Sequence, residues 1–206
     1  MDIIELVIDE NDEYSGIEAI SVVSAPAIEE NFISLKDNQQ IRLAEVSKEK
    51  RLLIGAALIP DKPIYRKNGE QEFYIYFSKD TVAKASQMYL KAGNQGQATM
   101  EHKEEKLEGM TVVESWIIED LVHDKSRKYS LDLPLGTWMV SMKVDNDDIW
   151  NNYVKQHKIQ GFSIEGYFAD KMSLRPKDKQ IDKLNEDDKL LKDIIDVLKE
   201  SNTNTK

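Results

Sequence analysis

Serine and histidine are the residues of this sequence best suited to chemistry, because a serine hydroxyl and an imidazole base together can cleave an acyl bond. The 206 residues contain three histidines, His102, His123 and His157, and no cysteine. The lack of cysteine excludes a cysteine nucleophile, a thiolate zinc site and a disulfide framework. The histidines are scattered, without a helical i,i+4 pair, so the sequence predicts neither a zinc site nor a cofactor.

Ser163 has the most suggestive surroundings of any serine, because it lies in the segment Gly161–Gly166, Gly-Phe-Ser-Ile-Glu-Gly. Small residues at both ends of this segment let another backbone approach the hydroxyl closely. The spacing Gly-x-Ser-x-x-Gly differs from the Gly-x-Ser-x-Gly nucleophile elbow, and no helix clearly follows, which disfavours an α/β-hydrolase. On spacing alone, a serine in such a strand is most often structural.

The elements that must position these residues are mostly strands. Seven segments are rich in β-branched and aromatic residues and are expected to be extended. Two helices are expected, one after an N-cap at Ser78 and one capped by Asp145. About seven strands favour an α+β, mainly β fold, in which a closed or nearly closed antiparallel β-barrel is flanked by helices. The expected strands are Ile3–Asp9, Ile41–Val46, Arg51–Ile59, Glu72–Phe77, Thr111–Asp120, Trp138–Val144 and Gly161–Ala169.

The segment Ile20–Ile28 has small residues around Pro26. Proline cannot donate to a sheet ladder, so this segment is predicted to be an edge strand, a loop or an extended arm rather than a central strand. Residues 1–40 as a whole are a candidate extended N-terminal arm. The small side chains of Ser24–Ala27 would also suit a proteolytic cleavage site.

The charge balance excludes some classes of partner. The formal net charge is −10 and the isoelectric point is about 4.9, which disfavours general binding to nucleic acid. No apolar run approaches the roughly 18 residues that a membrane span requires, and the N-terminus does not resemble a signal peptide. We therefore expect a soluble intracellular protein without nucleic-acid or membrane partners.

The charges also divide the chain near residue 170. Residues 171–206 contain no aromatic residue, and Leu184, Leu191 and Leu198 recur every seven residues. This pattern predicts a charged, amphipathic helical tail with a disordered end, next to a folded domain over residues 1–170. The apolar stripe of the tail would either pack on its own domain or contact a helical partner.

Several motifs occur together in an order that resembles the phage prohead (procapsid maturation) serine proteases, in particular the XkdF-like group. The resemblance covers roughly residues 3–170, and its specificity comes from the shared order, because each motif alone is weak. The motifs are Met100–Lys103, Gly109–Trp116, Leu135–Val144, Ile149–Trp150 and Gly161–Gly166, with Gly16–Ser21 and Ala25–Phe32 near the N-terminus.

This resemblance implies both a fold and a reaction. The family is similar to the herpesvirus assembly proteases (assemblins), whose core is a seven-stranded, mostly antiparallel β-barrel surrounded by helices. It implies an endopeptidase that cleaves scaffold protein, the N-terminal segment of the coat protein and itself. The cleavage would take place inside the procapsid in the host cytoplasm. The implied partners are the scaffold and major capsid proteins, with a homodimer or higher homo-oligomer expected by analogy.

The resemblance also implies roles for individual residues. It places the family's histidine at His102 and its nucleophile at Ser163. A neutral imidazole would accept the serine proton and return it to the leaving amine, and its reference pKa of about 6.5 suits both steps. In the herpesvirus relatives the third member is a histidine that follows the serine, but no histidine follows Ser163 here. The first choice for an acidic third member is Glu114, which lies in a motif close to His102. The second is Glu165, on the strand face of Ser163, and a dyad without a carboxylate stays open.

Two other classes of function also stay open. One is a catalytically inactive relative that acts as a capsid-assembly or scaffold protein, in which the tail matters and Ser163 does not. The other is a small-molecule hydrolase on a β-barrel. Labelling of Ser163 by a fluorophosphonate in a way that requires His102 would favour the protease.

Overall fold

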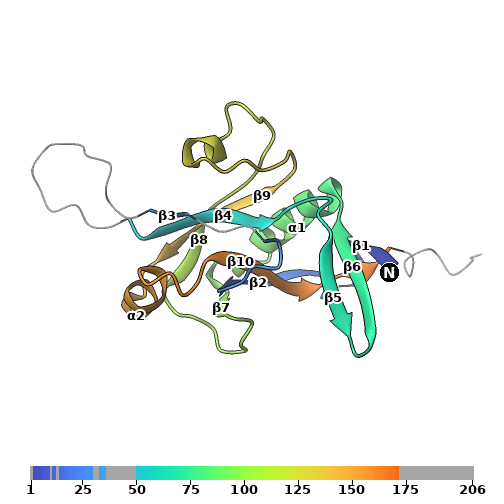
Figure 1. The fold of residues 1–206 in the computed structure, drawn as a ribbon, viewed down its shortest axis with the longest axis horizontal. Coiled ribbons are helices and arrows are strands. Elements are labelled where there is room, and N and C mark those ends of the chain that lie inside the picture. The colour runs from blue at the N-terminus through green and yellow to red at the C-terminus, as the bar shows by residue number, and fades with distance from the viewer. Residues whose placement is uncertain (1, 10, 13, 30–32, 36–49, 172–206) are drawn as a thin grey trace, which may run out of the picture. The chain divides into compact units, whose positions relative to one another are not determined.

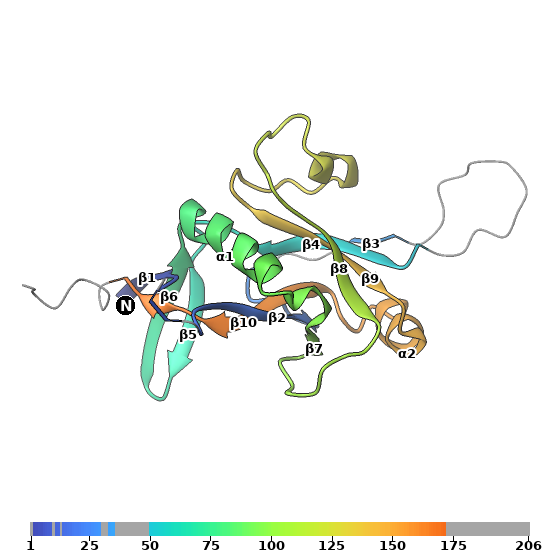
Figure 2. The same cartoon turned by 180° about the vertical axis from the view of Figure 1, so that it is seen from behind.

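The computed structural model of this chain describes residues 2–9, 11–12, 14–29, 33–35 and 50–171. In this part the protein is mainly β, with its strands in three separate sheets (Figures 1 and 2). All elements named below belong to one compact unit, residues 1–170. The expected strand at residues 41–46 and the expected helical tail lie outside the described residues.

The first sheet has four strands in the order β11-β1-β6-β5. Its strands are β1 (Asp2–Val7), β5 (Ile64–Asn68), β6 (Gln71–Phe77) and β11 (Ala169–Asp170). β5 and β6 form an antiparallel hairpin, whereas β1 runs parallel to β6. This parallel pair was not expected, because the sequence pattern of a strand does not reveal the direction of its neighbour.

The second four-stranded sheet is antiparallel throughout, in the order β3-β4-β9-β8. Its strands are β3 (Ile33–Leu35), β4 (Leu52–Leu58), β8 (Met110–Ile117) and β9 (Trp138–Val144). The bounds of β9 are the predicted ones. β4 and β9 are buried over nearly their whole length, as expected of near-continuous apolar runs at the centre of a sheet.

The third sheet carries the candidate site and has three strands in the order β10-β2-β7. They are β2 (Gly16–Val23), β7 (Ala98–Met100) and β10 (Gly161–Tyr167). β10 is antiparallel to β2, and β7 is parallel to β2. The predicted edge or loop position of Ile20–Ile28 is therefore wrong for its first residues, because the central strand ends at Val23, before Pro26 can interrupt the ladder.

Two segments are α-helical among the described residues. α1 (Lys79–Lys91) begins after Ser78, as predicted. The short α2 (Asp147–Ile149) continues into a π-helical turn over Trp150–Val154. Its N-cap is Asn146 rather than the predicted Asp145, since the Asn146 side chain accepts a hydrogen bond from the Ile149 N–H at 3.0 Å. No helix in the described part of the chain is long and apolar enough to cross a membrane.

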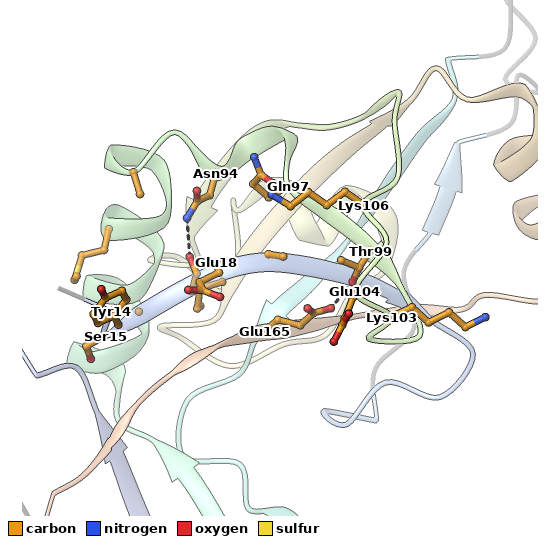
Figure 3. A pocket seen from close by; sticks show the side chains of 15 residues that line it. Tyr14, Ser15, Glu18, Asn94, Gln97, Thr99, Lys103, Glu104, Lys106 and Glu165 are labelled. Carbon is orange, nitrogen blue, oxygen red and sulfur yellow. Dashed lines mark hydrogen bonds between the residues drawn. The ribbon is translucent and has the colours of Figure 1, made fainter. Parts of the chain in front are cut away.

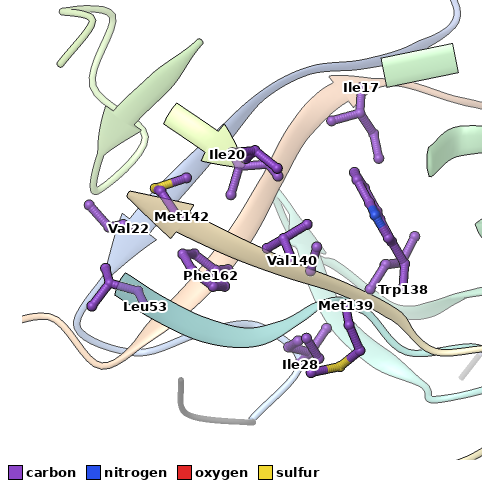
Figure 4. Packing of buried hydrophobic residues seen from close by; sticks show 14 of the residues in the cluster. Ile17, Ile20, Val22, Ile28, Leu53, Trp138, Met139, Val140, Met142 and Phe162 are labelled. Carbon is purple, nitrogen blue, oxygen red and sulfur yellow. The ribbon is translucent and has the colours of Figure 1, made fainter. Parts of the chain in front are cut away.

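The core contains buried side chains from all three sheets, from α1 and from the α2 region. Figure 4 shows part of it, mainly from the second and third sheets. Trp138 is fully buried, stacks edge-on against Tyr89 of α1, and donates from Nε1 to Ser115 Oγ at 2.8 Å. Large fully buried side chains of this core include Trp150, Phe162, Ile20, Leu53, Met139 and Met142.

The predicted closed barrel is wrong. A barrel requires one ladder that returns to its first strand, whereas the described strands form three open sheets with two α-helical segments. Two of the sheets also contain a parallel pair. The sequence predicted about seven strands, whereas the described residues contain eleven, and the partners of a strand are set by tertiary contacts that strand patterns do not encode.

Candidate active site

A row of three hydroxyl groups crosses the third sheet. Ser163 of β10 is the register partner of Ser21 in β2, and Ser21 is the register partner of Thr99 in β7. Directly opposed residues in neighbouring strands project to the same face of a sheet. All three are buried, with 8%, 0% and 4% of their surface exposed. One face of this sheet is therefore polar, while the other, bearing Phe162 and Ile20, belongs to the core.

His102 is held over this polar face by a tight turn after β7. Glu101 and His102 both adopt left-handed backbone conformations, with φ of 51° and 56°. Such a conformation costs roughly 1–2 kcal/mol for a residue other than glycine. The turn is fixed by the His102 N–H, which donates to Ser21 Oγ at 3.0 Å, and by the Glu101 N–H, which donates to the Val22 carbonyl at 3.1 Å. Backbone strain of this kind is concentrated at functional sites.

The His102 ring contacts a carboxylate on the strand of Ser163. His102 Nδ1 lies 3.3 Å from Glu165 Oε1. The Thr99 hydroxyl donates a hydrogen bond to the same oxygen, as Figure 3 shows. The register partner of Glu165 is Ala19, whose small side chain leaves room for the carboxylate to reach across β2 to Thr99. Thr99, His102 and Glu165 thus form one cluster on the polar face.

Ser163 lies on the face of this cluster without being bonded to it. Two residues along a strand, Glu165 and Ser163 project to the same side. Among the described residues, however, Ser163 Oγ takes part in no hydrogen bond. The Nδ1 atom of His102 faces Glu165, which leaves Nε2 as the nitrogen that could act on the serine, the same division of roles that a serine protease triad uses.

Glu114, the first-choice third residue, lies elsewhere in the fold. It belongs to β8 in the second sheet, where it accepts hydrogen bonds from Lys125 Nζ and Ser141 Oγ. These bonds, first that from Lys125, hold the pKa of the Glu114 carboxyl below its usual value. The structure brings Glu165 rather than Glu114 to His102. Glu165 was the second choice because it lies two residues from Ser163, and the first choice, Glu114, rested on its closeness to His102 along the chain.

Gly166 is needed for strand packing beside the site. A β-bulge lies between Glu165 and Gly166, where β10 crosses close to the start of β2. A Cβ atom on Gly166 would lie 2.0 Å from the Gly16 carbonyl oxygen and 2.8 Å from Ile17 Cα. The small size of Gly166 thus lets β2 of the same chain pack against β10, whereas the sequence predicted that the small residues would let a backbone approach the Ser163 hydroxyl.

Two cavities border the strand that carries Ser163. The larger, about 620 Å³, lies over the polar face and is lined by Glu165, Thr99 and the two residues that follow His102 (Figure 3). The smaller, about 320 Å³, is lined mainly by aliphatic and aromatic side chains and includes Ser163 in its wall. Ser163 thus lines only the smaller cavity and Glu165 only the larger one, whereas His102 lies in the wall of neither.

The other two histidines lie in exposed turns. His123 Nδ1 is 2.9 Å from Asp120 Oδ2, and hydrogen bonds from the Val122 N–H, the His123 ring and the His123 N–H lower the pKa of Asp120 to about 2. His157 is exposed after the π-helical turn. Within the described ranges, no group of three or more histidine or acidic side chains could hold a metal ion.

A comparison with known proteins assigns the chain to a family. No curated protein and no solved structure matches the chain. The family model described as "Putative phage serine protease XkdF" matches residues 40–172, well over half of the sequence. The matched region contains His102, Ser163 and Glu165. The chain therefore belongs to this family of phage serine proteases.

Proposed function

We propose that this protein is a serine endopeptidase with Ser163 as nucleophile, His102 as general base and Glu165 as the carboxylate that orients the imidazole. The observation that carries the proposal is the contact between His102 Nδ1 and Glu165 Oε1, on the strand that presents Ser163. Family membership supports the reaction class. The assignment of the three residues rests on their shared position on the polar face of the third sheet.

In this mechanism the Ser163 hydroxyl attacks the carbonyl carbon of the scissile peptide bond. His102 Nε2 accepts the hydroxyl proton as the new C–O bond forms, and the tetrahedral intermediate collapses to an acyl-enzyme when the protonated ring passes that proton to the leaving amine. Water then attacks the ester, with His102 again as base, and Ser163 is released. Before the first step, the imidazole must turn from its present position until Nε2 lies within hydrogen-bond distance of Ser163 Oγ.

Glu165 has two effects on the base in this mechanism. Its carboxylate accepts a hydrogen bond from Nδ1–H, which fixes the tautomer with a free Nε2 lone pair. Its negative charge also stabilises the imidazolium that forms in the transition state. The Thr99 hydroxyl donates to Glu165 Oε1 and thereby limits the rotation of the carboxylate.

We further propose that the substrates are the proteins of the immature phage capsid. These are the scaffold protein, the N-terminal segment of the major capsid protein and the protease itself, cleaved inside the procapsid in the host cytoplasm. Membership in a phage serine protease family supports this setting. Assembly as a homodimer or higher homo-oligomer is part of the same proposal.

Coexpression with the coat and scaffold proteins tests the proposal. Wild-type protein should yield particles whose coat and scaffold termini are trimmed, as measured by mass spectrometry of the intact chains. Ser163→Ala should fold normally and yield untrimmed chains. If Ser163→Ala particles carry the same trimmed termini, with host proteases excluded by deletion strains, Ser163 is not the nucleophile.

A second candidate is an inactive relative that acts in capsid assembly. It is favoured by the burial of Ser163 and by its lack of a hydrogen bond to His102. The same coexpression separates the two functions. If the protein acts only in assembly, no chain is trimmed, and particles form equally well with the wild-type protein and with the Ser163→Ala variant.

A further inference from the structure

The smaller cavity has the position of a substrate side-chain pocket. Its wall contains both Ser163 and Ile164, which project to opposite faces of β10, so the cavity lies along an edge of that strand. β10 is an outer strand of its sheet, with β2 on its other side. A substrate chain with one side chain in this cavity would have its backbone close to Ser163, because Ser163 is part of the cavity wall.

The chemistry of the cavity is apolar. Its wall is built from the first sheet, β4 and the residues after β2, and includes Ala27, Ile28, Leu58, Ile64, Phe77 and Phe168. Most of these side chains are buried and belong to or pack against the core. Burying a carboxylate or an ammonium group there without a partner is strongly unfavourable, whereas burying additional methylene groups is favourable.

Arg66 is the one charged residue in this wall. It lies in β5 and is exposed, and burial of part of its side chain lowers the pKa of the guanidinium. Its Nη1 atom donates a hydrogen bond to the Tyr65 carbonyl at 3.0 Å. An exposed guanidinium at the rim keeps its charge in water and leaves the interior of the cavity to apolar groups.

We propose that this cavity binds the side chain of the substrate residue whose carbonyl Ser163 attacks, and that it selects an aliphatic or aromatic residue there. The proposal rests on the proposed function, because it takes Ser163 as the reacting atom. A volume of about 320 Å³ accommodates a leucine or phenylalanine side chain. Discrimination between such residues and smaller or charged ones follows from the lost apolar contact and the desolvation of charge.

Peptidyl diphenyl phosphonates test the proposal, because they phosphonylate a serine nucleophile and carry one chosen side chain next to the phosphorus. The labelling rate of Ser163 in wild-type protein is measured with leucine, phenylalanine, alanine and aspartate analogues at that position. The leucine or phenylalanine probe should react at least tenfold faster than the aspartate probe, with alanine between them.

Two alanine-to-leucine substitutions test whether the side-chain preference arises in this cavity. Ala27→Leu places a larger side chain in the cavity wall and should slow the leucine and phenylalanine probes about tenfold while sparing the alanine probe. Ala25→Leu is the matched control, because Ala25 is exposed and outside the cavity wall, and it should change no rate. Thermal melting of both variants checks that they fold. If Ala27→Leu does not fold, the wild-type preference still decides.

The outcomes separate this inference from the proposed function. A small alkyl fluorophosphonate that labels Ser163, combined with equal rates for the leucine and aspartate probes, overturns the pocket and keeps the nucleophile. A preference for aspartate likewise overturns it and points to Arg66. If neither the small probe nor any peptidyl probe labels Ser163, both proposals fail.

Discussion

His102 Nδ1 lies 3.3 Å from Oε1 of Glu165, a residue two positions after Ser163 on the same face of β10. A single strand therefore supplies both the candidate nucleophile and the carboxylate that contacts the candidate base. The histidine comes from the turn after β7, on the far side of β2. Three strands that are distant in sequence must pair in one register to assemble the site.

The two glutamates should differ strongly when each is replaced by glutamine. Glu165→Gln should lower kcat by about 10²–10⁴-fold, because a neutral amide neither stabilises the imidazolium nor fixes the tautomer. Glu114→Gln should leave kcat within a few-fold of wild type, since its partners are Lys125 and Ser141. The measurement is the hydrolysis rate of a cleaved coat-protein peptide. The reverse ranking of the two variants would return the role to Glu114.

Thr99 should act as a positioning residue for the carboxylate. Thr99→Val removes the hydroxyl that donates to Glu165 and should lower kcat about 3- to 30-fold with little change in KM. Thr99→Ser keeps the donor and should restore most of the rate. If Thr99 had only a structural role, both variants would instead have a lower melting temperature, and their kcat values would not differ in this way. Circular dichroism measures the melting temperatures in parallel.

Gly166→Ala should destabilise the fold. The added methyl group would meet the backbone of Gly16 and Ile17, so β10 must shift away from β2, at a cost of about 1–3 kcal/mol in the free energy of unfolding. Urea denaturation measures this change. Gly96→Ala is the control, because no atom lies within 4 Å of its added Cβ. Equal stability of the two variants would show that β10 and β2 do not approach this closely.

Acid should remove the stabilising effect of Glu114. Hydrogen bonds from Lys125 and Ser141 lower the pKa of this carboxyl from 4.5, so the ionised form stabilises the folded state above that pH. The contribution is lost as the pH falls through the lowered pKa. With 46% of the side chain exposed, we expect less than about 1 kcal/mol. Glu114→Gln should melt below wild type at pH 7 and level with it in strong acid. A difference in melting temperature that persists in strong acid would show that the stabilisation does not come from the ionised Glu114 carboxylate.

The sequence predicted the strands with strong patterns well and their arrangement poorly. β9 has the predicted bounds because Trp138–Val144 is a bounded, mostly apolar segment. The start of α1 after Ser78 also followed from local signals, although the Ser78 side chain makes no capping hydrogen bond. The sequence did not predict β2 as a central strand, because Pro26 was taken to exclude the whole segment Ile20–Ile28 from such a position, whereas β2 ends at Val23. The predicted barrel was wrong because strand partners depend on contacts between residues far apart in the chain.

In the candidate site, Ser163 and His102 came from motif order. They stay predictions, and both positions lie within the range that the family model matches. The ranking of the carboxylates depended on distance along the chain, which favoured Glu114. In the fold, β8 belongs to a different sheet, and the short side chain of Ala19 lets Glu165 reach Thr99 across β2. The contact of Glu165 with Thr99 and His102 depends on the register of three strands, which the sequence pattern does not reveal.

The most direct test of the account is the reaction of the protein with a small alkyl fluorophosphonate, followed by mass spectrometry of the labelled peptide. The account predicts one label, on Ser163, and a labelling rate that falls at least a thousandfold in His102→Ala. The labelling rate of Glu165→Gln should lie between those of wild type and His102→Ala. His123→Ala, which alters an exposed turn, should be labelled at the wild-type rate. A label on another residue, or an undiminished rate in His102→Ala, would contradict the account.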